Sequence, residues 1–348
     1  MFCEETPLYL YFITNNFIDQ QSYTIIGIND ELSVNNCYNT CIMVDLHTHS
    51  NTSDGELSPA LLIKEAARLG LRAIALTDHD TINGLEDARI SAEACAEKIH
   101  FIPGIEININ WSSKITPRGA PGLGPGGEFH LLGLGINKPS PAFINAIEEL
   151  SRRREVRNRE ILDKMYELSL LDTSPDDLSG NDQKKTWDEL LEISGGNSMG
   201  RPHFAKFLIK RKIVKNQNQA FSRYLGVGKP LYVPKEGMIF EEAVLLIRES
   251  GGLPVLAHPA SLYVAWGRLP YLIKILKNLG LMGIEAWHPT AKPGACHRLE
   301  ALAQSLGLYS TEGSDFHGSV RPDRKLGYSS RGRKISDSVL EAIPELLR

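Results

Sequence analysis

Short apolar runs alternate with helical patterns along most of the chain after Met43. Residues 59–69 place apolar and alanine side chains at helical spacing, with Ser58 positioned as the N-cap and Gly70 as the stop. Strands alternating with helices of this length imply parallel β-α-β units, and six or seven of them predict an α/β barrel. The predicted strands are 43–47, 72–77, 101–109, 129–136, 253–257, 282–287 and 308–311, and the other predicted helices are 85–98, 240–250, 270–279 and 295–306.

The pattern changes in the middle of the chain, where long, charged helical segments replace the alternation. We therefore expect a barrel built from residues 43–138 and 238–348, interrupted by a mostly helical insertion, 139–237, that acts as a substrate-binding cap. Residues 112–127 contain PRGAPGLGPGG, a composition that predicts a loop. The chain contains no internal repeat.

The first 42 residues do not share this organisation. They carry acids and amides but no basic start, no clean apolar stretch and no small-residue cleavage site, which is unlike a signal peptide. Met43 begins the first strongly patterned stretch, MVDLHTHS. Two hypotheses stay open: translation starts at Met43 and residues 1–42 are a mis-annotated extension, or they form a genuine, weakly ordered arm.

Composition narrows the class of protein. With 348 residues and 42% hydrophobic content, the chain can bury a barrel core and a smaller insertion. The net charge of −4 gives no general attraction for duplex DNA, so any nucleic-acid contact must be local. No apolar run is long enough to span a bilayer. The cysteines lack zinc-finger spacing and indicate reduced thiols in a cytoplasmic protein; they are Cys3, Cys37, Cys41, Cys95 and Cys296.

Histidine and acidic residues gather at the predicted strand ends. His47 and His49 stand two apart in DLHTHS, so on an extended strand they point to the same side. The C-terminal ends of barrel strands meet at one rim, where side chains from different strands converge on a ligand. Nine donors at that rim exceed the needs of one metal; the other seven are Asp54, His79, Glu106, His130, His258, Asp315 and His317.

Imidazole and carboxylate donors together suit Mn²⁺, Fe²⁺ or Zn²⁺, and the lack of cysteine donors argues against a thiolate zinc site. Adjacent metals bridged by a carboxylate can hold a hydroxide between them at neutral pH. They also neutralise the charge that builds on phosphoryl oxygens during in-line attack. The donor set therefore predicts phosphate-ester hydrolysis without a protein nucleophile.

A single histidine after a strand is more often structural than a ligand. We assign His100, His288 and His297 mainly to that class, although His288 follows a strand end and could lie behind the ligands. Asp80 is expected to cap the helix that follows it. For the nine donors a structural role is implausible, because two closely spaced pairs and several further donors fall at separate strand ends.

The strings DLHTHSNTSDG, ALTDHDT, PGIE, FHLLGLG, VLAHP and GSDFH, in this order, resemble the PHP (polymerase and histidinol phosphatase) family from Met43 to about Gly327. The chain is most similar to the branch that hydrolyses nucleoside 3′,5′-bisphosphates or trims short RNA from the 5′ end. The resemblance implies a distorted (β/α)₇ barrel with three metals, Mn²⁺ before Fe²⁺ or Zn²⁺. The Gly/Pro-rich loop before His130 looks longer than in the family and leaves the substrate range in doubt.

The resemblance also implies how the donors are shared among the metals. One metal would take His47, His49, Glu106 and Asp315; a second would share Glu106 and add His130 and His258; a third would take Asp54, His79 and His317. Of these, the residues expected to be catalytic as well as metal-binding are Asp54, His79, Glu106, Asp315 and His317.

The insertion carries candidates for holding an anionic substrate. In SRRREVRNR, residues 151–159, Arg153 and Arg157 are one helical turn apart. Such a run is usually a solvated helix face, and we expect that for most of these arginines. Arg154 or Arg157 could still reach a second phosphate.

Two further strings match this branch of the family. In GRPHFAK, Arg201 and His203 could clamp a phosphate, or Pro202 simply opens a helix with its neighbours exposed. In YLGVGKPLYV, Lys229 is a possible phosphate contact. Tyr224 or Tyr232 could stack on a base, although packing is the commoner role.

The leading hypothesis is a cytoplasmic, metal-dependent phosphoesterase acting on a small phosphorylated nucleotide or short 5′-phosphorylated RNA. The first alternative is a PHP phosphatase for another small metabolite, histidinol phosphate included. A non-enzymatic PHP module fits poorly, because the donor set is complete and no polymerase sequence is present. An amidohydrolase barrel would usually need a bridging lysine where this chain has Glu106. The metal, the oligomeric state and the balance between bisphosphate and RNA stay open.

Overall fold

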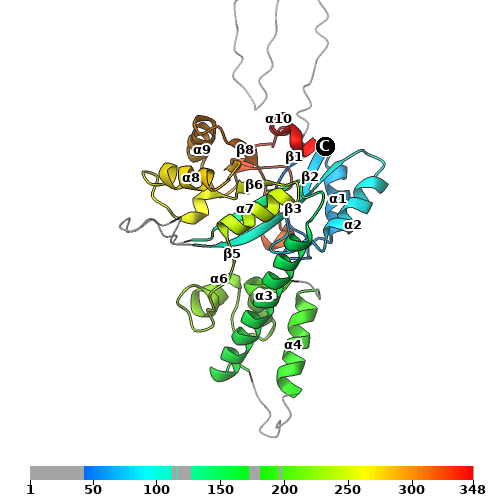
Figure 1. Cartoon of the computed structure of the whole chain (residues 1–348). Coiled ribbons are helices and arrows are strands. Elements are labelled where there is room, and N and C mark those ends of the chain that lie inside the picture. The colour runs from blue at the N-terminus through cyan, green and yellow to red at the C-terminus, as the bar shows by residue number, and fades with distance from the viewer. Residues whose placement is uncertain (1–42, 112–114, 116–126, 172–180, 196–197, 348) are drawn as a thin grey trace, which may run out of the picture. The chain divides into compact units, whose positions relative to one another are not determined.

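The computed structural model describes residues 43–111, 115, 127–171, 181–195 and 198–347 (Figure 1). The chain divides into two units, Met1–Thr40 and Cys41–Arg348, and every described residue belongs to the second. The hypotheses for residues 1–42 and for nearly all of the loop 112–127 therefore fall outside the described residues.

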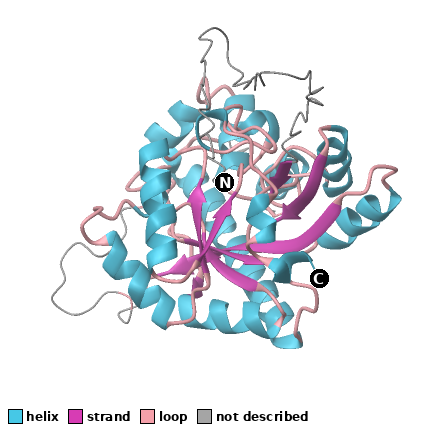
Figure 2. Ribbon diagram, turned by 90° about the horizontal axis from the view of Figure 1, so that it is seen from above, coloured by secondary structure: helices cyan, strands magenta, loops and turns pink. Residues whose placement is uncertain are grey.

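Seven strands form the main sheet, in the order β1-β2-β3-β4-β6-β7-β8. Just beyond β1 and β8, a parallel bridge between Thr48 and Phe316 joins the two ends of this path. Figure 2 shows the strands with helices outside them. The predicted α/β barrel is confirmed; its strands are β1 (Met43–Asp45), β2 (Leu71–Leu76), β3 (His100–Asn110), β4 (His130–Leu134), β6 (Leu253–Leu256), β7 (Gly283–Trp287) and β8 (Tyr309–Glu312), with the short β5 (Met238–Ile239) paired to β3.

Local sequence signals set the first helix. The Ser58 side chain accepts a hydrogen bond from the backbone N of Leu61, and Gly70 follows the helix with φ +77, so the predicted cap and stop are both confirmed. The helices around the barrel are α1 (Pro59–Arg68), α2 (Leu85–Ala94), α7 (Phe240–Glu249), α8 (Leu269–Asn278), α9 (Pro293–Ser305) and the C-terminal α10 (Ser338–Glu341). None of the described helices has the length and apolarity that crossing a bilayer requires.

Strand β4 runs antiparallel to both β3 and β6, so the prediction of purely parallel units is wrong at this point. The described part of the connection from β3 to β4 carries no helix, and without a crossover the chain turns back along its neighbour. The start of β4 therefore lies where the other strands finish. This direction brings His130, the first residue of β4 and the partner of Asn108, to the same rim as the strand-end donors.

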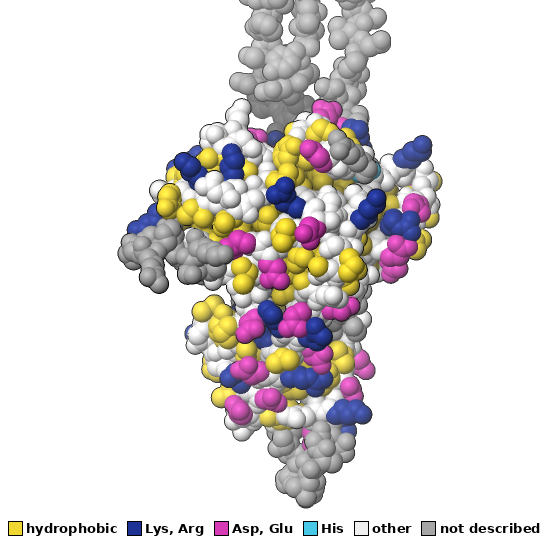
Figure 3. All heavy atoms as spheres, viewed as in Figure 1, with side chains coloured by type: hydrophobic (Ala, Val, Ile, Leu, Met, Phe, Trp, Pro, Cys, Tyr) yellow, Lys and Arg dark blue, Asp and Glu magenta, His cyan; other side chains and the backbone are white. Residues whose placement is uncertain are grey.

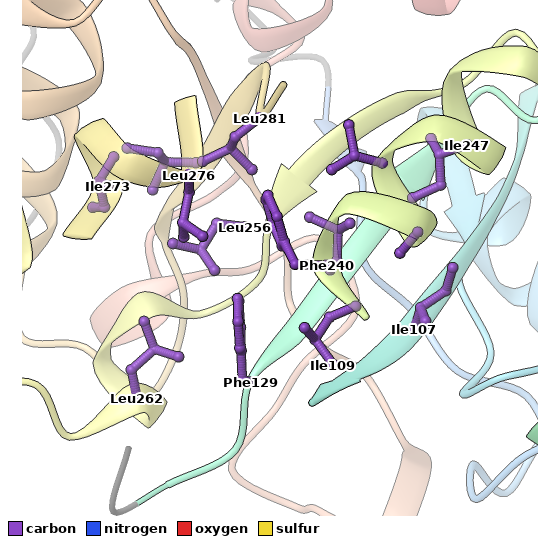
Figure 4. Close-up of a cluster of buried hydrophobic side chains, with 14 of the residues drawn as sticks. Ile107, Ile109, Phe129, Phe240, Ile247, Leu256, Leu262, Ile273, Leu276 and Leu281 are labelled. Atoms are coloured by element: carbon purple, nitrogen blue, oxygen red, sulfur yellow. The ribbon is translucent and has the colours of Figure 1, made fainter. Parts of the chain in front are cut away.

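Strand β3 shows how side chains divide between the barrel interior and the outer layer. Ile107 and Ile109 point toward Phe240 of α7 in the outer cluster, as Figure 4 shows. Residues of the other parity, Ile102 among them, join apolar side chains of β1, β2, β4 and β6 in a second cluster inside the ring, and side chains of α10 pack against this cluster. Glu106 has the same parity as Ile102 and faces the interior. Burial of each such apolar side chain contributes roughly 1.5–3 kcal/mol.

The residues between β4 and β5 form helices with a hydrophobic cluster of their own, which includes Leu190, Phe204 and Phe207. These elements are α3 (Pro141–Glu167), α4 (Asn181–Ile193), α5 (Arg201–Lys210), α6 (Gln217–Ala220) and the π-helical turn η1 (Phe221–Leu225). On the face drawn in Figure 3, acidic and basic side chains are interspersed over α3 and α4. A separate cluster is what an insertion subdomain requires; the boundaries 139 and 237 stay a prediction.

Candidate metal centre

Nine histidine, aspartate and glutamate side chains converge at the rim, and we call them the donor cluster. They fall into four groups whose ligand atoms lie within 4.8 Å of one another. Each of the nine residues singled out from the sequence belongs to at least one group. The groups are His49, Asp54, His79 and His317; His47, His49 and Asp315; His47, Glu106 and His258; and His79, Glu106 and His130.

Glu106 lies at the middle of the donor cluster, with its side chain 1% exposed. Its Oε1 is 2.8 Å from both His130 Nδ1 and His258 Nε2. Its Oε2 is 2.9 Å from His79 Nδ1 and 3.3 Å from His49 Nε2. Burial opposes ionisation, but His79 and the other histidines outweigh it and hold the pKa of Glu106 well below its usual range. A carboxylate whose two oxygens face different imidazoles has the arrangement of a bridging ligand.

Asp315 approaches the two histidines of the first motif. Its Oδ1 is 3.1 Å from His49 Nε2 and 3.5 Å from His47 Nε2, and the two Nε2 atoms are 3.1 Å apart. Asp315 has φ +52, a strained conformation of the kind that clusters at functional sites. Two ring nitrogens and a carboxylate oxygen this close repel one another unless a proton or a cation lies among them.

Asp54 is positioned by a loop that a buried aspartate holds in place. Asp78 accepts hydrogen bonds from Ser50 N (2.8 Å) and Ser53 Oγ (2.6 Å). Asp54 Oδ1 then lies 3.3 Å from His317 Nε2. Burial opposes its ionisation, but His317 and further histidines keep the pKa of Asp54 well below its usual range.

Some polar atoms of the donor cluster are not satisfied by hydrogen bonds within the protein, and bound divalent metals would satisfy them. His49 Nδ1, His79 Nδ1 and Glu106 Oε2 are buried, and none of them has a hydrogen-bonding partner in favourable geometry among the described residues, although the last two lie 2.9 Å apart. Buried polar atoms without partners are rare and usually mark an ion, a water or a functional role. Burial, only partly offset by Glu106, lowers the pKa of His79 to about 4, so its ring is neutral near pH 7 and free to act as a ligand. Neutral imidazoles with carboxylates are the ligands of Mn²⁺, Fe²⁺ and Zn²⁺.

Among the described residues outside the predicted set, three ionisable ones contact the side chains of the donors. Glu285 Oε1 is 2.9 Å from His47 Nδ1. His288 Nε2 is 3.0 Å from Asp315 Oδ2, and Arg324 pairs with the same oxygen. His288 thus lies behind a donor, which is the place that its position after a strand end allowed. The alternation of β7 could have revealed Glu285, which faces inward between two outward apolar residues, whereas no sequence signal distinguishes Arg324.

Asp80 does not cap the following helix, so that expectation is wrong. Helix α2 begins at Leu85 with Gly84 at its N-cap, four residues beyond Asp80. The Asp80 carboxylate instead pairs with Arg154 of α3 and, at 3.6 Å, with Lys235. It therefore ties the barrel to both ends of the insertion.

Four basic side chains beside the donors form what we call the cationic cluster: Arg154, Arg157, Arg201 and Lys235. Arg157 is buried and its Nε donates to Val233 O at 3.1 Å. Burial first, and then Arg201 and Arg154, lower the pKa of Arg157 to about 10, so it remains charged at pH 7. Lys235 was missed because nothing in its local sequence sets it apart.

The other arginines of the 151–159 run are solvated, as expected for most of them. Arg152 and Arg153 pair with Glu149, and Arg159 pairs with Glu155, all on exposed helix positions. Arg153 and Arg157 therefore do not share an environment.

The GRPHFAK segment opens α5. Arg201 Nη2 lies 3.6 Å from Glu128 Oε1, and the guanidinium is 5.6 Å from the centre of the Tyr232 ring. His203 Nδ1 accepts a hydrogen bond from Gly200 N (2.9 Å), which leaves the proton on Nε2. Burial lowers the pKa of His203 to about 4. Lys229 is exposed on the turn after η1, and within the described residues no ion pair joins it to either cluster.

Comparison with known proteins decides the family. The PHP domain model matches residues 45–224, which is 180 of the 348 residues. The chain belongs to the PHP domain family. This PHP chain is 30% identical to a 3′,5′-nucleoside bisphosphate phosphatase of Chromobacterium violaceum, over 82% of the chain and 91% of that protein. It is 31% identical to a 5′-3′ exoribonuclease of Haemophilus influenzae, over 78% of the chain and 89% of that protein.

A solved structure has the same fold. It is described as an amidohydrolase from Chromobacterium violaceum with bound sulfate and no metal, and it superposes with a TM-score of 0.68 at 29% identity. The match covers 86% of this PHP chain and 96% of that one. The resemblance predicted from the motifs, to the PHP family and to its bisphosphate phosphatase and exoribonuclease branch, is confirmed.

Proposed function

We propose that this PHP chain is a metal-dependent phosphoesterase that hydrolyses nucleoside 3′,5′-bisphosphates or short 5′-phosphorylated RNA. One observation carries the proposal: the donor cluster lies beside the cationic cluster, so a metal centre for hydrolysis and a charged site for a second phosphate adjoin. The Chromobacterium and Haemophilus relatives, which are named for these two substrate types, support the choice.

The donor cluster has an accessible side that faces the helical insertion. Asp54 and His79 have side chains 15% and 14% exposed, the largest fractions among the nine donors. His203 of α5 lies close enough to Asp54 for that carboxylate to affect its pKa. We infer that substrate approaches from this side, between the barrel rim and α3 and α5. His203 Nε2–H can then donate to a phosphate oxygen.

Bound divalent metals would activate water and neutralise phosphoryl oxygens during attack. The chain's own residues would hold them: imidazoles of the donor cluster as neutral ligands, and Glu106 as the carboxylate shared between neighbouring metals. We propose three metals, with Mn²⁺ ahead of Fe²⁺ and Zn²⁺. The mixed nitrogen and oxygen set admits all three ions.

The cationic cluster carries more charge than its acidic partners. Four cations face two carboxylates, Asp80 and Glu128. A phosphate dianion would balance the remainder, and Arg201 could bind it with two donors at once. A substrate with a second phosphate, or the phosphodiester backbone of RNA, fits this surplus better than a single phosphate ester does.

Hydrolysis of C–N bonds is the competing candidate, since the superposed Chromobacterium structure is described as an amidohydrolase. The position between the imidazoles is held here by Glu106 and not by a lysine. The adjoining cationic cluster also favours a polyanionic substrate over an amide.

The test is phosphate release with Mn²⁺ from adenosine 3′,5′-bisphosphate, beside histidinol phosphate and a short 5′-phosphorylated RNA. We expect the bisphosphate or the RNA to be preferred. Asp315→Asn should abolish this activity, with the exposed Asp323→Asn as the matched control. Preference for histidinol phosphate would overturn the substrate class, and no phosphate release from any substrate by the metal-loaded protein would overturn the proposal.

A further inference from the structure

Glu285 is a buried acid in the barrel interior that belongs to none of the four donor groups. It stands in the middle of β7, and its side chain is 1% exposed. Oε1 is 2.9 Å from His47 Nδ1, and Oε2 accepts a hydrogen bond from the backbone N of His258 at 2.7 Å. Each oxygen of Glu285 therefore contacts a member of the donor cluster: His47, which follows β1, and His258, which follows β6.

The contact with His47 determines which ring nitrogen faces the centre. When Nδ1–H donates to a carboxylate, the lone pair is left on Nε2. His47 Nε2 is the atom 3.1 Å from His49 Nε2 and 3.5 Å from Asp315 Oδ1. Carboxylates that hold the second nitrogen of a ligand histidine fix its tautomer and orientation and raise its basicity.

The contact with His258 acts on the backbone. His258 has φ +26 and ψ 68, an unfavourable conformation for a residue with a side chain. The 2.7 Å bond from its N–H to Glu285 holds this turn, and the turn presents His258 Nε2 to Glu106 at 2.8 Å. One carboxylate thus supports a ring on one side of the centre and a strained turn on the other.

The surroundings leave the Glu285–His47 pair no room to rearrange. A Cβ on Gly313 would lie 2.3 Å from His47 Cβ and 2.6 Å from Glu285 Oε1. The backbone of the GSDFH segment therefore packs directly on the pair, and only glycine fits there.

We propose that Glu285 is a positioning residue that fixes the His47 ring and the His258 turn and thereby sets the affinity of the metals those histidines would hold. The inference rests on the proposed function only in requiring that the centre binds metal. It predicts weaker metal binding without any change in the donors themselves.

The experiment uses the full chain, stripped of metal with a chelator. Glu285→Gln keeps the size of the side chain, but its amide can accept from only one of the two N–H groups. We expect about 10- to 100-fold weaker binding of Mn²⁺ or Zn²⁺ in competition with a chromophoric chelator. The metal-free unfolding temperature reports folding separately. The matched control is Glu312→Gln, a buried carboxylate on the neighbouring β8 that pairs with Arg333 at 3.0 Å.

Equal metal affinity in Glu285→Gln and wild type would overturn the inference, and so would an equal loss in Glu312→Gln. If Glu285→Gln does not fold without metal, Glu285→Asp replaces it, since the shorter side chain keeps the charge but cannot span both partners. That variant should bind metal more weakly and change the visible spectrum of the Co²⁺ form; unchanged values would overturn the inference. A wild-type chain that binds no metal would instead refute the proposed function.

Discussion

The donor cluster and the cationic cluster lie side by side but are held in different ways. Most of the donors stand on strands or within a few residues of a strand end, where ladder hydrogen bonds and bridges such as His79–Glu106 fix the backbone, and Asp54 stands on a loop that Asp78 holds in place. Their side chains are short. The cations stand at the ends of long side chains on α3, on α5 and on the segment before β5. Ion pairs with Asp80 and Glu128 hold three of them, and a hydrogen bond to Val233 O holds Arg157.

This difference separates two requirements of the proposed reaction. Metal ligands tolerate little displacement, and ligands on a rigid sheet meet that requirement. A phosphate held by long cations can be recognised through charge even when the side chains adjust. We therefore expect changes in the donor cluster to abolish activity, and changes in the cationic cluster to alter substrate preference or the attachment of the insertion.

The largest expected effect follows from Glu106→Gln. It removes the carboxylate that faces five imidazoles, so turnover should fall by about 10³-fold or more and bound metal should be lost. Initial rates and metal content measure both, and circular dichroism checks that the barrel remains folded. Retained metal with near-normal turnover would refute the central place of Glu106.

The difference between donors fixed near strand ends and cations held by long-range contacts also explains what the sequence could predict. The HxH and DxH pairs and the strand-end positions identified the nine residues of the donor cluster, because parallel strands end at one rim. His130 was found although its strand direction was not predicted, since antiparallel β4 begins where its neighbours end. Helix boundaries were close wherever caps were present, as at Ser58 and Gly70.

The contacts behind the donors and across the insertion could not be predicted. Lys235 and Asp80 meet only because the helical insertion folds back onto the barrel, 155 residues apart in sequence. Arg154 is in an exposed-looking run, and only the packing of α3 turns it toward Asp80 while its neighbour Arg153 stays in solvent. Long-range ion pairs leave no periodic signal in a single sequence.

Asp80→Asn should cause the largest loss of stability. Removing one partner of a buried charge pair leaves the other uncompensated, at about 3–5 kcal/mol, and Asp80 is the partner of two cations. Urea unfolding measures the loss. Asp87→Asn, an exposed acid in α2, is the matched control and should unfold as wild type does. Equal stability of the two variants would mean that Asp80 does not attach the insertion.

Removal of metal should destabilise the barrel more moderately. A ligand present at 100 times its Kd stabilises the folded state by about 2.7 kcal/mol, so chelation should lower the unfolding temperature by several degrees. The shift should be absent in Glu106→Gln, which lacks the site, and preserved in Asp80→Asn. A shift of equal size in all three proteins would indicate that the metal binds outside the donor cluster.

The smallest effect, and the one that best separates the two clusters, is expected from Arg201→Ala. Arg201 contacts Glu128 and the Tyr232 ring but no donor in the described residues, so its loss should leave metal content unchanged. One charge-assisted contact contributes about 1.5–3 kcal/mol, which corresponds to a rise in KM for the bisphosphate of about 10- to 100-fold. A generic phosphate ester, which lacks the second phosphate, should show a much smaller rise.

Arg153→Ala, on the solvated face of α3, is the control. Equal rises for both substrates would assign Arg201 to the attachment of α5 and not to the second phosphate.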